Sequence, residues 1–415
     1  MQAWRCWIIN DDSAQTIQVW PNTSDKIDGG AADAVSATAI DAGSSATFVT
    51  VDAENWYTAD VAAAAAAVAA PNPNLIINGG MTVSQRGTVT SVGASNGRTF
   101  GGPDRFMTYV QGSPQGRGTV SQDTTVIASS GQSTSMKWDC TTAESAVAAG
   151  DLITIQYRIE GQDVQQFMYA TSDAVSITLS FDFQSPKSGT HCVAVYAIDD
   201  TTHNIVEFTV ASADTMEHFD ITIALETTGT AIPDDNTEGF SVTWPLVCGS
   251  TYQNTAGSGT GEDYATSNQQ NLLDNTANNV ILSNVKLEVA SAATAFEHES
   301  YGETLAKCLR YYWEPVQATN EPVGSGIGRN STSAWIAVHY PVTMRADPTF
   351  STPVATQFTL YYNNTSQSCT AIASTGYENE NGMHLNITSL TSMATTGAIM
   401  VAEHGSAALI WDAEL

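Results

Sequence analysis

Paired carboxylates are the side chains in this sequence whose type and spacing could most directly do chemistry. Asp199 with Asp200, and Asp234 with Asp235, are adjacent acids. A glycosidase needs one carboxyl group as an acid and a second as a nucleophile or base. Sequence spacing does not show whether two carboxyl groups face each other across a bond. Because the chain has 43 acids in 415 residues, adjacent acids are also expected by chance, and we rank a polysaccharide-degrading enzyme last.

Motifs of other enzyme classes do not occur in a supporting context. There is no nucleophile elbow, zinc-protease motif, phosphate-binding loop or dinucleotide-binding fingerprint. The glycine-rich stretch 324–328 has no strand–helix–strand pattern around it, so we predict a loop there. No fixed-period repeat of the kind that builds long β-helices is found. We therefore expect a protein that is not an enzyme.

Acidic segments raise the question of a bound metal ion. The turn 234–238, Asp-Asp-Asn-Thr-Glu, offers the oxygen ligands that Ca²⁺ prefers, although a solvated turn is the simpler interpretation. Glu297, His298 and Glu299 are adjacent candidate ligands. Neighbouring side chains of an extended segment point to opposite faces, so these three would not converge on one ion. We expect no cofactor, with Ca²⁺ at the acidic turn as the alternative.

The cysteines are widely and irregularly spaced. No Cys-x-x-Cys pair and no Cys/His spacing typical of zinc occurs. The pattern indicates isolated, mostly buried thiols in a protein made in a reducing cytoplasm. The six residues are Cys6, Cys140, Cys192, Cys248, Cys308 and Cys369.

Aromatic residues of the last hundred positions could stack on sugar rings. The candidates are Trp335, Tyr340, Tyr361, Tyr362 and Tyr377. Most aromatic residues in strands belong to a core, which is the competing interpretation. We select Trp335, Tyr361 and Tyr362 as candidate glycan-stacking residues.

A short amphipathic helix stands out in a sequence that otherwise predicts strands. Ser300 is a suitable N-cap, and Glu303 completes a capping box. Leu305, Leu309 and Tyr312 follow at helical spacing and predict one apolar face. We expect a helix within 299–314, stopped by Pro315, that clamps two β-domains together. The predicted structural clamp consists of Phe296, Ser300, Tyr301, Glu303, Tyr311 and Tyr312.

The elements around this helix predict a mainly β protein. Residues 1–60 alternate short apolar runs with turn clusters and predict a small N-terminal β-module. Residues 74–298 predict eight or more strands, most of which alternate apolar residues with Thr, Ser or acids, as is typical of half-buried antiparallel strands. They predict a β-sandwich of jelly-roll type. Residues 315–415 predict a C-terminal β-domain closed by a last strand at 409–411.

An alanine-rich stretch occupies 61–73, between the N-terminal module and the sandwich. Alanine has the highest intrinsic helix propensity, and Val61 and Val68 are seven residues apart, as in a heptad. One interpretation is a short helix near the axis of an oligomer. The other is a plain linker, since isolated helices of this length are marginal in water.

Charge excludes two classes of partner. The net charge is −29, from 43 acids against 14 bases, and such a field repels nucleic acid phosphates and anionic membrane surfaces. We predict no nucleic acid and no membrane partner. The first residues have no apolar run long enough for a signal peptide, so we expect synthesis in the cytoplasm without export.

Five pieces of the chain, in order, resemble one family of tail-fibre and virion appendage proteins of tailed bacteriophages. The third piece contains the Phe-Glu-His-Glu-Ser-Tyr-Gly-Glu run, and the order and spacing agree across residues 74–415. The pieces are 74–81 with 85–87, 102–107, 285–303 with 308–312, 340–349, and 412–415.

The resemblance implies a structural component of a phage virion and brings no catalytic residues. It implies a carbohydrate-module-like β-sandwich, then a helix and a terminal β-domain, assembled as a homotrimer that docks on capsid or tail proteins. Residues 1–60 would serve for virion anchoring or oligomerisation. We expect a fibre, spike or capsid-attached appendage located in the virion. The alternative is a receptor-recognition protein at the tail tip that binds a host surface glycan.

Overall fold

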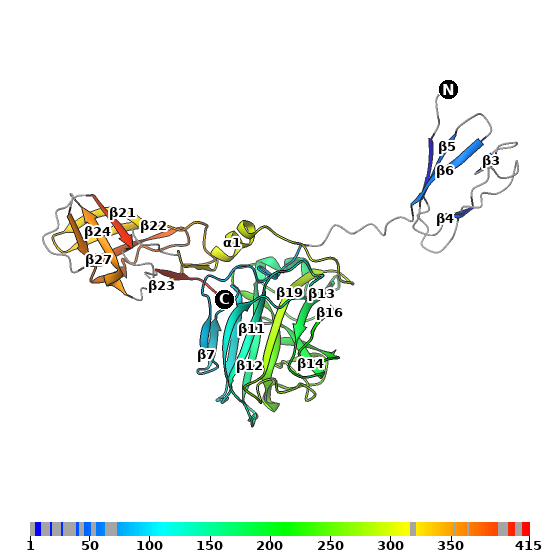
Figure 1. Cartoon of the computed structure of the whole chain (residues 1–415), viewed down its shortest axis with the longest axis horizontal. Helices are drawn as coiled ribbons and strands as arrows, with labels where there is room; N and C mark the ends of the chain where they lie inside the picture. Colours follow the sequence, from blue (N-terminus) through cyan, green and yellow to red (C-terminus); the bar gives the residue numbers. More distant parts are fainter. Residues whose placement is uncertain are drawn as a thin grey trace. The chain divides into compact units, whose positions relative to one another are not determined.

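The protein divides into two compact units, Met1–Asn72 and Pro73–Leu415, in a computed structural model (Figure 1). The structure describes residues 73–315, 321–351, 354–362, 365–388, 397–402 and 409–415, together with six short strands before residue 63. Within these residues, no helix has both the length and the apolar character needed to cross a membrane.

The described strands of the first unit form two small sheets. One has the order β1-β5-β6-β3 and the other pairs β2 with β4. These strands are β1 (Arg5–Ile9), β2 (Ile17–Gln18), β3 (Lys26–Ile27), β4 (Ala39–Ile40), β5 (Ser45–Thr50) and β6 (Asn55–Ala62). Strand β6 takes in the first two residues of the predicted alanine-rich helix or linker. Positions 63–72 of that prediction lie outside the described residues.

The sandwich begins with a six-stranded antiparallel sheet in the order β16-β13-β19-β11-β10-β7. Its central strands alternate apolar residues with Thr, Ser or Asp, as the sequence predicts. Its strands are β7 (Val89–Val92), β10 (Arg117–Asp123), β11 (Ser135–Thr142), β13 (Ser176–Gln184), β16 (Met216–Ala224) and β19 (Asn279–Val289).

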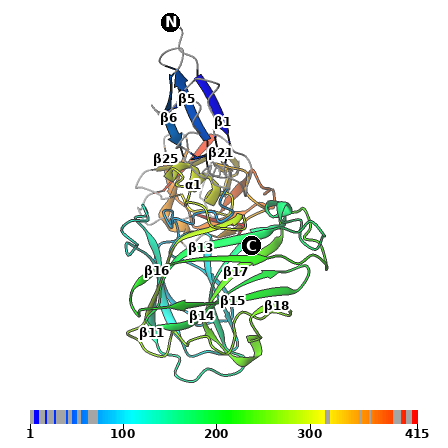
Figure 2. The same ribbon diagram turned by 90° about the vertical axis from the view of Figure 1, so that its right-hand side faces the viewer.

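The second sandwich sheet is antiparallel and seven-stranded, in the order β18-β15-β14-β17-β12-β9-β8. Several of its strands are labelled in Figure 2. They are β8 (Gly97–Phe100), β9 (Phe106–Gln111), β12 (Leu152–Glu160), β14 (Gly189–Ala197), β15 (Thr202–Val210), β17 (Glu238–Cys248) and β18 (Gly257–Thr260). Three 3₁₀ turns, η1 (Gly161–Asp163), η2 (Gln165–Phe167) and η3 (Ser250–Tyr252), lie in its connections.

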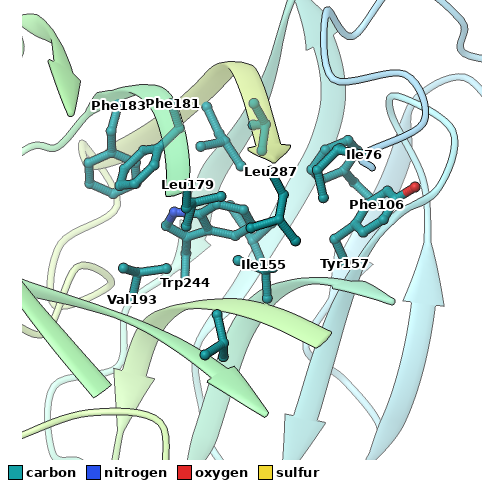
Figure 3. Packing of buried hydrophobic residues seen from close by; sticks show 14 of the residues in the cluster. Ile76, Phe106, Ile155, Tyr157, Leu179, Phe181, Phe183, Val193, Trp244 and Leu287 are labelled. Carbon is teal, nitrogen blue, oxygen red and sulfur yellow. The ribbon is translucent and has the colours of Figure 1, made fainter. Parts of the chain in front are cut away.

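One apolar core lies between these two sheets. Trp244 of β17 is fully buried and meets Phe181 of β13 edge to face, with ring centroids 5.6 Å apart. Figure 3 shows Trp244 among Leu179, Ile155 and Val193, which come from both sheets. Because both sheets contribute to a single core, the predicted β-sandwich is confirmed.

The helix α1 (Tyr301–Leu309) is shorter than predicted. It ends before Tyr312 because Tyr312–Trp313 form strand β20, which pairs with Trp411 and Asp412. Pro315 is therefore not what stops it. The predicted apolar face is also shifted by one residue.

The buried face of this segment is Thr304, Cys308 and Tyr311, whereas Leu305 and Leu309 are half-buried. Tyr311, rather than the leucines, faces the sandwich, because its hydroxyl donates to Glu160 there.

The C-terminal residues form a second seven-stranded antiparallel sheet, here called the C-terminal sheet, in the order β25-β24-β28-β21-β22-β27-β26. Its strands are β21 (Glu321–Asn330), β22 (Ser333–His339), β24 (Phe358–Tyr362), β25 (Thr365–Ser368), β26 (Ala371–Ser374), β27 (Gly382–Thr388) and β28 (Gly397–Ala402); the 3₁₀ turn η4 (Ala355–Gln357) precedes β24.

Two predictions for this region are wrong. The glycine-rich stretch 324–328 is not a loop but part of β21. A side chain at Gly326 would place its Cβ 1.7 Å from the Trp335 carbonyl oxygen, and one at Gly324 would come within 2.6 Å of the Ala337 carbonyl oxygen. The glycines thus allow β21 to pair closely with β22.

The predicted last strand does not close the C-terminal sheet. Strand β29 (Ile410–Asp412) joins β20 and β23 (Thr349–Ser351) in a separate three-stranded sheet. Trp411 at its centre is fully buried and stacks on Trp313 with ring centroids 4.5 Å apart.

The described cysteines are all buried, in agreement with the expectation of mostly buried thiols. They are Cys140, Cys192, Cys248, Cys308 and Cys369, and Cys6 has no described side chain.

Candidate functional site

A buried ion pair between Arg105 and Glu414 joins the sandwich to the end of the chain. The two side chains are 2% and 3% exposed. Arg105 Nη2 donates to the Arg158 carbonyl oxygen at 2.8 Å, and its guanidinium lies 3.4 Å from the centre of the Tyr311 ring. A buried charge needs both a counter-charge and hydrogen bonds, and Arg105 has a carboxylate, a carbonyl and an aromatic face.

Arg86 is the second cation on the same carboxylate. It donates to Glu414 at 3.1 Å and to Asp412 at 3.2 Å, and its guanidinium lies 3.5 Å from the centre of the Tyr312 ring. The Glu414 carboxylate therefore bridges Arg86 and Arg105. We call the contact formed by these residues the interdomain junction.

Glu160, at the end of β12, is a second buried carboxylate of the interdomain junction. It accepts two bonds from Arg310, at 3.1 and 2.8 Å, and one from the Tyr311 hydroxyl. Gln162 Nε2 also donates to it at 2.7 Å. Paired donation from a guanidinium gives a directional, charge-assisted contact, so the C-terminal end of α1 is tied to the sandwich.

The loops before β9 shape the sandwich side of the interdomain junction. Gln85 donates from its backbone and its side-chain amide to the Asp104 carboxylate, at 2.8 and 2.6 Å, and from the same amide to the Tyr312 carbonyl oxygen at 2.9 Å. Asn78 Nδ2 donates to the carbonyl oxygens of Val83 and Asp104 at 2.9 and 3.0 Å. These bonds place Arg86 and Arg105 next to the C-terminal segment.

The first resembling piece is held against β19. Asn74 donates to the Val285 carbonyl oxygen at 2.9 Å and accepts from the Leu287 N–H at 3.0 Å. A Cβ at Gly79 would lie 2.0 Å from that Val285 oxygen. Glycine at position 79 is thus required by close backbone approach.

Arg345 connects the terminal residues to the acidic turn. It donates to the carbonyl oxygens of Ala413 at 2.7 Å, Asn236 at 2.6 Å and Glu414 at 3.1 Å, and the Asn236 amide donates back to the Arg345 carbonyl oxygen at 2.7 Å. Arg158 pairs with Glu238 at the end of the same turn. The turn considered for Ca²⁺ therefore makes protein contacts.

Electrostatics keep the arginines of the interdomain junction charged. Burial lowers the pKa of Arg105, but the Glu414 carboxylate together with Tyr157 and Tyr311 raises it by more, so the pKa is raised overall. The pKa of Arg86 is raised in the same way, with Glu414 and Asp412 opposing the effect of burial. Burial raises the pKa of the Tyr157 hydroxyl to about 12. Both cations persist across the pH range in which proteins are stable.

The predicted structural clamp is present in part. Ser300 and Glu303 form both halves of the capping box, and Tyr311 and Tyr312 lie in the interdomain junction. Phe296 is half-buried against the His298 ring, 5.3 Å away. Tyr301 is 59% exposed and is not part of the clamp, because the helix begins at the surface.

Sequence reasoning missed the charged residues of the interdomain junction. Arg86, Arg105, Arg345 and Glu414 lie inside the resembling pieces Gln-Arg-Gly, Pro-Asp-Arg-Phe, Met-Arg-Ala-Asp-Pro and Asp-Ala-Glu-Leu. An arginine flanked by residues that favour turns, repeated three times in a strongly acidic chain, is the signal that could have identified them.

Two of the candidate glycan-stacking residues share one face of the C-terminal sheet. Trp335 lies on the same side of β22 as Ala337. Ala337 is paired with Ser325 of β21, Ser325 with Ile399 of β28, and Ile399 with Tyr361 of β24. Directly opposed residues share a face. Tyr361 is 43% exposed, and the side chain of Tyr362 lies outside the described residues.

The remaining aromatic candidates divide between core and surface. Tyr340 is buried against Trp411 and Trp313, as the core interpretation predicts. Tyr377 is exposed and meets the Trp335 ring at a centroid distance of 6.0 Å.

The outer face of the seven-stranded sandwich sheet holds a covered polar network. Arg158 Nε donates to Gln156 at 3.1 Å, and Gln156 Nε2 donates to Thr243 at 3.1 Å. Tyr264, 1% exposed, donates to Glu262 at 2.7 Å. These side chains form hydrogen bonds with one another, and Glu262 is the exposed member of the network.

The paired acids lie in exposed turns. Asp200 accepts bonds from Tyr169, Thr202 and the Thr230 N–H at 3.2, 2.8 and 2.6 Å. Asp235 accepts two bonds from Thr237, which lower its pKa. These carboxylates hold their own turns in place.

Glu297, His298 and Glu299 are exposed and line a pocket of about 120 Å³ with Asn78 and Gln132. In the part of the chain that the structure describes, no three His, Cys, Asp or Glu side chains are arranged to hold a metal ion.

The fold and the interdomain junction together define a mainly β protein, with a β-sandwich tied by charged and aromatic contacts to a second β-domain. No protein-family model matches the chain, and no curated protein matches it.

Similar solved structures include the enzymatically active domain of tailspike protein 4 of bacteriophage CBA120, at 10% identity and a TM-score of 0.26 over 52% of this chain and 21% of that one. Another is the family 11 carbohydrate-binding module of Clostridium thermocellum, at 14% identity and 0.25 over 52% of this chain and 100% of the module. A carbohydrate-binding module of the β-sandwich superfamily matches at 10% identity and 0.26 over 69% of this chain and 97% of that one. These values assign no ligand, activity or assembly to this chain.

Proposed function

We propose that this protein is a non-enzymatic structural component of a tailed-phage virion, a fibre, spike or capsid-attached appendage that self-associates as a homotrimer and docks on capsid or tail proteins. It is made in the host cytoplasm and acts by assembly rather than by chemistry.

The observation that supports this proposal is the meeting of the resembling pieces at the interdomain junction. Arg86, Arg105 and Arg345 come from three different pieces, and the last piece supplies Glu414. The resemblance thus covers the contacts that hold two β-domains together. A projecting appendage requires such contacts between its domains.

Labelling of virions tests the location. Antibody raised against residues 1–60 is bound to intact particles and viewed by electron microscopy, and we expect label at a fixed symmetric position. Native mass measurement at micromolar concentration should give three chains. Particles without label, or a stable monomer, would contradict the virion role or the trimer respectively.

A second candidate function is recognition of a host surface glycan at the tail tip. The observation in its favour is the exposed aromatic face of the C-terminal sheet that carries Trp335, Tyr361 and Tyr377. Binding of the full chain to a glycan array tests it, and no bound glycan at high protein concentration would contradict it. Release of reducing ends during incubation would instead indicate a depolymerase.

A further inference from the structure

Exposed apolar and aromatic groups gather on the outer face of the C-terminal sheet. Ile327 of β21 lies directly opposite Trp335 of β22 and is 60% exposed, and Tyr377 is 65% exposed. The His384 ring stacks on Trp335 with a centroid distance of 6.3 Å. We call the group Ser333, Trp335, Tyr377, His384 and Asn386, with Ile327 and Arg329, the Trp335 face.

Polar atoms within the Trp335 face have no hydrogen-bond partner. They are Ser333 Oγ, Trp335 Nε1 and Asn386 Oδ1, each of which is buried. Asn386 lies directly opposite Trp335, and Ser333 is two residues along β22 on the same side. The Ser333 residue is 6% exposed. Because buried polar atoms in proteins are nearly always hydrogen-bonded, three neighbouring atoms without partners point to a ligand that supplies them.

Arg329 covers part of the aromatic surface. Its guanidinium lies 4.6 Å from the centre of the Trp335 ring, and the side chain is exposed. A cation–π contact at an exposed site is worth about 0.5–1 kcal/mol. A sugar ring that stacks on Trp335 can therefore displace Arg329 at small cost.

We propose that the Trp335 face is a binding site for a neutral oligosaccharide, an inference that rests on the second proposed function. A sugar ring stacks on Trp335 beside Tyr377. Its hydroxyl groups accept a hydrogen bond from Trp335 Nε1 and donate to Asn386 Oδ1. Since hydroxyl groups both donate and accept, one ligand chemistry satisfies both kinds of unpartnered atom.

Charge selects a neutral glycan over an acidic one. The chain carries a net charge of −29, which repels acidic polysaccharides over the distances at which binding begins. The unpartnered atoms belong to an indole, an amide and a hydroxyl group, none of which is charged. On the outer face of the sandwich, Arg158, Gln156 and Thr243 are paired with each other, as are Tyr264 and Glu262.

Tyr361 extends the site along the sheet. It lies on the same face as Trp335, three strands away and two residues further along. With the usual spacing of strands, the two side chains are about 15 Å apart. One sugar ring cannot reach both side chains, so the ligand spans several rings.

The test measures affinity of the full-length chain for neutral and acidic oligosaccharides, first on an array and then by calorimetry. We expect a neutral ligand to bind, Trp335→Ala to weaken it at least tenfold, and Asn386→Ala to weaken it several-fold. Tyr301→Ala, a change at an exposed tyrosine outside the Trp335 face, should leave the affinity unchanged. Asn386→Ala keeps the ring, so it tests the site even if Trp335→Ala fails to fold.

Each other outcome overturns a defined part of the inference. If the chain binds a neutral glycan but the Trp335 and Asn386 variants bind equally well, the glycan function stands and this site is wrong. Binding of acidic glycans alone contradicts the ligand class. No binding to any glycan removes both the function and the site. A change in native mass in Trp335→Ala would show that the face contacts a second copy of the chain, which also overturns the inference.

Discussion

Arg105 and Glu414 are 309 positions apart in the sequence and form a buried ion pair in which both side chains are almost inaccessible to solvent. Arg105 belongs to the start of the sandwich and Glu414 is the penultimate residue. Their contact makes the chain end a structural part of the sandwich surface. Arg86 shares the same carboxylate and also pairs with Asp412, so two arginines are balanced by two carboxylates.

Removal of that carboxylate should strongly destabilise the protein. In Glu414→Gln, Arg105 stays buried without its counter-charge, and breaking one side of a buried pair costs about 3–5 kcal/mol. Chemical denaturation measures the change in the free energy of unfolding. The control is Lys137→Gln, which breaks a partly exposed pair with Asp139 and should cost less than about 1 kcal/mol. Equal losses in the two variants would show that the junction pair does not contribute to stability.

The helix N-cap should contribute a smaller, local stabilisation. Ser300→Ala removes the acceptor for the Glu303 N–H and one half of the capping box, and we expect a loss of about 1 kcal/mol. Ser267 is exposed and its side chain has no described hydrogen bond, so Ser267→Ala is the matched control. Thermal melts of both variants measure the effect. A Ser300 variant as stable as the control would argue against a capping role.

Two glycines should respond in opposite directions to the same substitution. Gly79→Ala forces a Cβ against the Val285 carbonyl oxygen at 2.0 Å and should destabilise the protein by at least 1 kcal/mol, the usual cost of overpacking. Gly302→Ala meets no atom within 4 Å and lies in α1, so it should stabilise by up to about 1 kcal/mol. Unfolding midpoints measure both changes. Destabilisation by both variants would contradict the open surroundings of Gly302.

Stability should depend on pH through His218. Its imidazole bonds Asp182 at 2.6 Å and Asp220 at 3.1 Å, and the Asp182 bond chiefly raises the pKa of His218 against the opposing effect of burial. A raised folded-state pKa means that this contribution is fully present below the unfolded value of about 6.5 and is lost as pH rises through the folded value.

The measurement is the free energy of unfolding between pH 5.5 and 8.5. The His218→Gln variant should lose stability at the acidic end of that range and little at the alkaline end. His298→Gln, at an exposed histidine beside Phe296, should leave the pH slope unchanged. A His218 variant with the wild-type slope would exclude this linkage.

Many strands and the helix of this fold could be predicted from local sequence patterns. The alternation of apolar and polar residues predicts strands at 152–159, 175–183, 240–247 and 280–289, because the period of a half-buried strand is visible in any single sequence. The structure has β12, β13, β17 and β19 there, with each end within about two residues of the predicted one. The Ser300–Glu303 capping box could likewise be predicted from neighbouring residues. The strand β10 was missed, since Gly118 and the polar residues around it interrupt the alternation. The strand β11 was missed although Met136, Trp138 and Cys140 alternate with polar residues.

The errors arose where a distant segment decides the local conformation. The stretch around Gly326 has the composition of a loop, yet β22 lies so close that only glycine fits. Leu309 was expected on the buried face of α1, but the helix is rotated so that Tyr311 reaches Glu160. Tyr301 was expected to clamp and is at the surface. Propensity is a weak guide wherever tertiary contacts override it.

The amino-acid sequence by itself determined the mainly β class, the sandwich strands, the capped helix and the acidic surface, because each follows from residue type and short-range spacing. Only the tertiary structure decided that Arg86, Arg105 and Glu414 meet, and that Trp335 and Tyr361 share one face. The first relationship depends on the packing of segments 309 or more residues apart, and the second on strand register across the C-terminal sheet. No short window of sequence encodes either of them.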